Sequence, residues 1–162
     1  MSTKKQRGRL ADIVMRESRA YAGALTAAGH EWFAASHTDP WPVGSELSSL
    51  HGRCLLAREC AAAGGLSLKK QRGLLEDITM REFQTYAGAL TAAGADWSAT
   101  WQSDVGPVCF ELSWLRGRFL LALECAHAGG LPLSSEEIVR LYRAHLAYRE
   151  LFPAGMPSLT DH

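Results

Sequence analysis

The sequence predicts an all-α fold, a helical bundle made of two tandem-duplicated helical hairpins and a C-terminal capping helix. Apolar residues recur at spacings of three and four along several segments, as on one face of an α-helix, and no segment alternates apolar and polar residues over the length of a strand. The 162 residues suit one domain, and 47% hydrophobic and 21% charged residues are typical of globular proteins. We therefore expect one helical domain over residues 1–152 and a flexible tail over residues 153–162.

The chain contains an internal repeat. Residues 4–68 align with residues 69–133 without a gap, and 42 of the 65 aligned positions are identical. We call these segments repeat 1 and repeat 2, so that each residue of repeat 1 corresponds to the residue 65 positions later. A duplicated segment that packs against its own copy replaces a homodimer, because both partners then belong to one chain. We therefore expect the repeats to form a dimer-like unit.

The first helix of each repeat ends in a run of small residues, YAGALTAAG, at residues 21–29 and again at residues 86–94. Gly29 and Gly94 close these runs, where a left-handed residue commonly ends a helix. Alanine and glycine leave room for a neighbouring helix to approach closely. We expect this small-residue face to contact the other repeat.

The second helix of each repeat is expected to begin near Ser45 or Cys109. It ends at two glycines followed by leucine, a pattern typical of the Schellman motif, in the segments at residues 64–66 and 129–131. After repeat 2, Ser134 and Glu137 have the spacing of a capping box. Together with a following apolar stripe, they predict a helix over residues 134–152.

A carboxylate lies in the middle of the apolar stripe of each first helix, at Glu17 and at Glu82. A buried carboxylate needs a partner, because burial removes the water that stabilises its charge. Arg53 and Arg118, on the second helices, are the expected partners, with a tyrosine one turn along as the alternative in each repeat. We interpret these residues as buried polar pairs that stabilise the fold.

A metal site is the alternative for the same carboxylates. Helical bundles with two metal ions use a Glu from each of two helices and a Glu-x-x-His from each of the others. The carboxylates available for it are Glu17, Glu59, Glu82 and Glu124. Only repeat 2 adds a histidine, His127, since repeat 1 has Ala62 there. The set is one ligand short, so we expect no metal, no cofactor and no catalytic residue, and a metal-dependent enzyme is the last alternative.

Basic residues cluster at the start of the first helix in both repeats. They are Lys4, Lys5, Arg7 and Arg9 in repeat 1 and Lys69, Lys70 and Arg72 in repeat 2. Cations at this position oppose the helix dipole, and an anion such as a nucleic-acid phosphate would account for them. Against this, the seventeen basic and seventeen acidic residues cancel, and a charge run often serves only to keep a surface solvated.

Two unmatched tryptophans, Trp41 and Trp101, lie in the segments that join the paired helices. If exposed, they are suited to anchor a partner protein. The sequence contains no secretory signal and no apolar run of membrane-spanning length, and its cysteines form no CxxC pair, which favours a cytoplasmic and bacterial origin. We expect a non-catalytic protein that binds another protein, with nucleic acid as the alternative partner.

Overall fold

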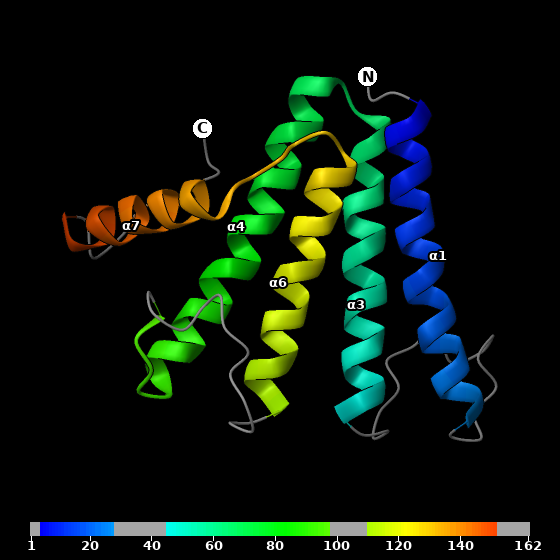
Figure 1. The fold of residues 1–162 in the computed structure, drawn as a ribbon, viewed down its shortest axis with the longest axis horizontal. Coiled ribbons are helices and arrows are strands. Elements are labelled where there is room, and N and C mark those ends of the chain that lie inside the picture. The colour runs from blue at the N-terminus through cyan, green and yellow to red at the C-terminus, as the bar shows by residue number, and fades with distance from the viewer. Residues whose placement is uncertain (1–3, 28–44, 98–109, 152–162) are drawn as a thin grey trace.

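The computed structural model describes residues 4–27, 45–97 and 110–151, and these residues are helical with short connections (Figure 1). The elements are α1 (Lys4–Ala27), α3 (Ser45–Ala62), the short 3-10 helix η1 (Ala63–Gly65), α4 (Leu68–Ala92), α6 (Phe110–Ala128) and α7 (Ser135–Leu151). No strand occurs among the described residues, which confirms the predicted all-α helical bundle. The predicted tail at residues 153–162 lies outside the described part of the chain.

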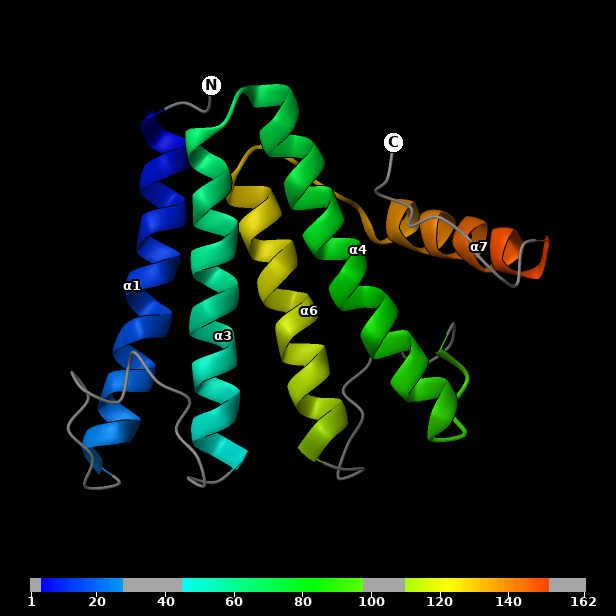
Figure 2. The same cartoon turned by 180° about the vertical axis from the view of Figure 1, so that it is seen from behind.

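Four of the helices stand side by side in the order α4, α6, α3 and α1, as both views show (Figures 1 and 2). Helices α3 and α6 run in one direction, and α1 and α4 run in the other. Each repeat therefore forms a hairpin, α1 with α3 and α4 with α6, and the hairpins meet where α3 packs against α6. Helix α7 contacts α4 and runs outward from it, crosswise to the bundle and away from α6 (Figures 1 and 2).

Two helices begin with the serine caps that their sequences favour. The Ser67 hydroxyl accepts a hydrogen bond from the Lys70 amide at the start of α4. At the start of α7, the Ser134 hydroxyl accepts from the Glu137 amide at 3.1 Å. Each bond satisfies an amide that has no partner within the first turn of a helix.

The carboxyl ends of the helices differ between the repeats. In repeat 2, Gly130 has a φ of 86° and the Leu131 amide donates to the Ala126 carbonyl at 2.8 Å, which is the predicted Schellman motif. In repeat 1, the chain turns through η1 instead, and the Leu66 amide donates to the Ala63 carbonyl. The prediction of the same cap in both repeats is therefore wrong for repeat 1.

The small-residue runs do not join the repeats. A Cβ atom added at Gly23 or at Gly88 would meet no other atom within 4 Å, and α1 and α4 lie on either side of the α3–α6 pair (Figure 1). The apolar residues of these runs, among them Tyr21 and Leu25, are buried within their own hairpin. The prediction that this face contacts the other repeat is wrong, because the second helices form the interface.

Aromatic side chains attach α7 to repeat 2. Tyr142 stacks on Phe83 with ring centroids 5.2 Å apart and meets the edge of Trp97 at 4.7 Å. Phe83 also packs against Phe119 on α6. In repeat 1 the corresponding two positions hold Ser18 and Cys54, whose Oγ and Sγ atoms lie 3.4 Å apart. Repeat 1 thus lacks the aromatic surface on which α7 docks.

Candidate functional site

The buried carboxylate of repeat 1 is bound by two arginines. Arg53 on α3 donates from Nε to one oxygen of Glu17 at 2.7 Å and from Nη2 to the other at 3.2 Å. Arg16, beside Glu17 on α1, donates from its Nε at 2.9 Å. Glu17 is 5% exposed, so its charge is balanced almost entirely by these two guanidinium groups.

The corresponding residues of repeat 2 repeat this geometry. Arg118 donates to the two oxygens of Glu82 at 2.7 and 3.2 Å, and Arg81 donates from Nε at 2.9 Å. The structure therefore brings together the buried pairs named from the sequence, Glu17 with Arg53 and Glu82 with Arg118. It does not bring the two carboxylates into one site.

Both clusters continue into the other repeat, and they do so reciprocally. The Arg53 Nη1 donates to the Gly117 carbonyl at 3.0 Å, while the Arg118 Nη1 donates to the Gly52 carbonyl at 3.1 Å. These four residues lie on α3 and α6. Each of these partly buried arginines thus joins the two helices of its own hairpin and also bonds to the second helix of the other hairpin.

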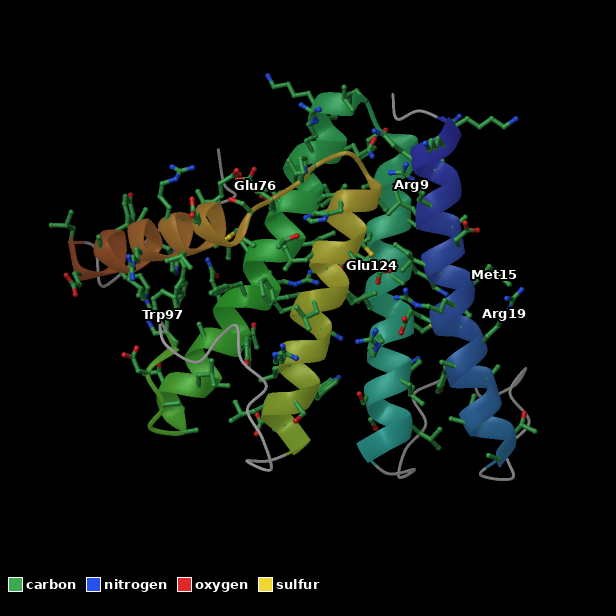
Figure 3. The ribbon with its side chains drawn as sticks, viewed as in Figure 1. Arg9, Met15, Arg19, Glu76, Trp97 and Glu124 are labelled. Atoms are coloured by element: carbon green, nitrogen blue, oxygen red, sulfur yellow. The ribbon has the colours of Figure 1, made fainter. Side chains whose placement is uncertain are left out.

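The outer arginines cross in the same reciprocal way. Arg16 forms two hydrogen bonds of 2.7 Å with the Glu124 carboxylate on α6, and Arg81 forms two of 2.8 Å with Glu59 on α3. Glu124 lies beside α3 in Figure 3. From the sequence, Glu59 and Glu124 are candidate ligands only of a metal site that is one ligand short. The retention of Arg16 and Arg81 at corresponding positions is the signal for the arginine contacts.

The pKa values of the two buried carboxyls follow from these contacts. Burial by itself raises the pKa of Glu17, but the hydrogen bonds from Arg53 and Arg16 outweigh it and hold the pKa below its ordinary value. The pKa of Glu82 is lowered for the same reason, with Arg118 and Arg81 as the donors. Both carboxyls are therefore ionised at neutral pH and have no proton to give.

The crossing arginines explain a glycine in the middle of each second helix. A Cβ atom on Gly52 would lie 2.9 Å from the Arg118 Nη1, and one on Gly117 would lie 3.2 Å from the Arg53 Nη1. Mid-helix glycine costs stability relative to alanine, so it needs a reason. The close approach of a guanidinium to the backbone carbonyl supplies that reason, and the Gly-Arg dipeptide shared by both repeats was its sequence signal.

Two thiols meet where α3 packs against α6. Cys60 and Cys125 are fully buried at corresponding positions, and a hydrogen bond between the two side chains, together with burial, raises the pKa of Cys60. A buried thiol with a raised pKa carries little of the thiolate that nucleophilic chemistry needs. We therefore interpret this pair as part of the interface between the repeats.

The metal alternative finds no ligand set in the described residues. No group of three or more His, Cys, Asp or Glu side chains with the arrangement of a metal site is found among residues 4–27, 45–97 and 110–151. Glu17, Glu59, Glu82 and Glu124 each bond to an arginine, and His127 Nε2 lies 3.2 Å from the Leu133 carbonyl. Those four carboxylates are thus held within the fold.

The basic clusters lie at one end of the bundle. Because α1 and α4 run in the same direction, their first turns share the end at which α3 and α6 finish (Figure 1). Lys4, Lys5, Arg7, Arg9, Lys69, Lys70 and Arg72 are all exposed there, and the first turns of α1 and α4 contain no acidic residue. We call this surface the basic end.

The carbonyl groups that end α6 have partners other than these cations. The Gly129 carbonyl accepts from the buried Gln71 side chain at 3.1 Å, and the Schellman bonds satisfy the carbonyls before it. Gln6 at the start of α1 contacts Gly130, so the same helix end also adjoins the first cluster.

The remaining sequence predictions fall partly outside the described residues. Trp41 and Trp101 lie in segments that the structure does not describe. None of the described helices combines the length and the apolar character needed to cross a membrane. A comparison of the chain with known protein families, curated proteins and solved structures finds no match.

Replacing Glu17 with alanine is expected to lower the free energy of unfolding by about 3 kcal/mol, because it leaves a partly buried arginine without its carboxylate. Glu82→Ala should cost a similar amount. Urea denaturation measures both. The control is Arg58→Ala, an exposed charge on α3, which should stay within about 0.5 kcal/mol of the wild type. Equal costs for Glu17→Ala and Arg58→Ala would contradict the role given to the buried pair.

Replacing Gly52 with alanine is expected to destabilise the protein by about 1 kcal/mol or more, since the new methyl group displaces the Arg118 guanidinium from its carbonyl. Gly88→Ala provides the matched control. It lies within α4 with no neighbour near its Cβ position, so it should stabilise the protein by about 0.5–1 kcal/mol. Thermal unfolding of the two variants checks the opposite signs, and stabilisation by both would refute the argument.

Proposed function

We propose that this chain is a non-catalytic helical binding protein in which the two repeats take the place of a homodimer, and that the partner it holds is a nucleic acid. The observation that carries the proposal is the position of the two basic clusters at one end of the bundle (Figure 1). A protein partner was the first expectation from the sequence. The tryptophans that favoured it lie outside the described residues, whereas both basic clusters lie within them.

The reciprocal contacts support the dimer-like part of the proposal. In a two-fold interface, residue i of one copy contacts residue j of the other, and j of the first contacts i of the second. Arg53 with Gly117 and Arg118 with Gly52 follow this rule, as do Arg16 with Glu124 and Arg81 with Glu59. Since α3 and α6 run in the same direction, the two-fold axis relating the repeats runs along the helices and keeps corresponding residues at the same end.

The charge at that end supports the choice of partner. Seven cations surround the start of α1 and α4, where the amide groups of a first turn also favour an anion. A protein that neutralises phosphates with lysine and arginine releases counterions, and this release drives binding without any reading of sequence. The basic end offers such contacts from both repeats.

The proposal predicts salt-dependent binding to a labelled nucleic acid in a gel-shift assay. The logarithm of the association constant should fall with the logarithm of salt concentration with a slope of about −3 or steeper. Exchange of Lys4, Lys5, Lys69 and Lys70 for glutamine should make the slope less steep, by about 0.9 for each of these lysines that contacts a phosphate. The control exchanges the exposed Arg140 and Arg143 of α7 and should leave the slope unchanged. Absence of any shift at low salt would end the proposal.

A protein partner is the second candidate, because two leucines at corresponding positions are exposed. Leu55 on α3 is 46% exposed and Leu120 on α6 is 42% exposed. Apolar side chains of this size on a surface are common singly, but a matched pair offers a partner two similar anchors. The two-fold relation of the helices makes the surroundings of the two leucines alike.

For the second candidate, the expected result is a partner that cross-links to the wild type in a cell extract and is lost when Leu55 and Leu120 are both changed to glutamine. The matched control is Leu151→Gln, which changes another exposed leucine. Quantitative mass spectrometry of the cross-linked fraction measures the loss, and thermal unfolding verifies that each variant is folded. If the wild type, the Leu55 and Leu120 variant and the Leu151→Gln variant all recover the same cross-linked proteins in equal amounts, this surface is ruled out.

A further inference from the structure

We propose that the nucleic acid is a double helix, held through its phosphates, and that it extends from the basic end along the exposed side of α1. This inference rests on the proposed function and specifies the surface and the form of the partner. It places the contact on one repeat more than on the other. The observations that lead to it are the charge along α1, the corresponding residues of α4 and the lack of exposed rings on α1.

Charged residues form a continuous stripe along α1. Lys5, Arg9, Asp12, Arg16 and Arg19 follow one another at spacings of four, three, four and three residues, which keeps them on one side of the helix. All five are exposed, and the Arg16 guanidinium is paired with Glu17 and Glu124. Figure 3 places Arg9 near the basic end and Arg19 further along α1. At about 1.5 Å per residue, the stripe is about 21 Å long.

The corresponding side of α4 differs in charge. Its residues are Lys70, Leu74, Asp77, Arg81 and Gln84, so a leucine and a glutamine replace the first and last arginines of the stripe. Glu76 adds a negative charge beside them, and α7, which has equal numbers of acidic and basic residues, packs against the same helix (Figure 3). An anion that leaves the basic end therefore finds more positive charge along α1 than along α4.

The side chains of α1 favour a duplex over other polyanions. Single strands are held by stacking on aromatic rings, but Tyr21 is the aromatic residue of α1 and it is buried. A membrane surface is held by several apolar side chains on the same face, but Met15 is the one large apolar side chain exposed on α1. A duplex presents about one phosphate per 1.7 Å of its axis, or about twelve over the length of the stripe. Cations alone are enough to bind these phosphates.

The test measures the salt dependence of binding for a 30-base-pair duplex and for a single strand of the same length, and sedimentation with anionic phospholipid vesicles. The variant changes Arg9 and Arg19 to glutamine, and the control changes Arg140 and Arg143, removing the same charge from α7. For the duplex, the Arg9 and Arg19 variant should reduce the slope by about 2. The control should change it by less than about 0.5. Circular dichroism verifies that both variants fold.

The outcomes separate the inference from the proposed function. If the lysine variants of the basic end weaken binding while the Arg9 and Arg19 variant retains the wild-type slope, the proposed function stands and the α1 surface is refuted. Equal or tighter binding of the single strand refutes the duplex, and so does equal or tighter binding of vesicles. A wild-type protein that binds none of the three probes ends both the proposed function and the inference.

Discussion

The fold depends on a partly buried arginine in each hairpin, which joins the two helices of its own hairpin and also bonds to one helix of the other. Arg53 and Arg118 each neutralise a carboxylate that burial alone would leave unstable, and each then uses a remaining N–H group for a glycine carbonyl across the α3–α6 interface. The two contacts depend on each other, because the bond to the carboxylate fixes the position of the guanidinium group that reaches the other hairpin. Formation of each hairpin therefore positions the donor by which the two hairpins recognise each other.

This pair of contacts is present in both repeats, but the packing of the interior differs between them. At one contact between the first and second helix, repeat 1 has Ser18 with Cys54 and repeat 2 has Phe83 with Phe119. Both sides changed in size together, as close packing requires, since one large and one small residue would leave a cavity or a clash. The larger pair gives α7 an aromatic surface to stack on. The difference in the interior therefore decides that α7 docks on repeat 2.

The sequence predicted the parts of the fold that depend on local pattern. Apolar periodicity gave the helices, Ser134 gave a cap, and a carboxylate in an apolar stripe gave a buried pair with Arg53. The prediction of the contact between the repeats was wrong. The small residues near Gly23 leave room for a neighbouring helix, but they do not show that one is present. The partners of Arg16 lie 108 positions away, at Glu124, and no local spacing indicates a contact of that range. The placement of the basic clusters at one end likewise required helix directions, which only the fold supplies.

The helix directions also decide what a duplicated surface can do. With α3 parallel to α6 and α1 parallel to α4, corresponding residues of the two hairpins lie at the same end of the bundle, so the two basic clusters lie together. An antiparallel pair would have separated them by the length of the bundle. The outer helices nevertheless differ: α4 has Leu74 and Gln84 where α1 has Arg9 and Arg19, and α7 packs against α4. The contacts that the repeats share therefore allow α1 and α4 to differ in the charge on their outer sides.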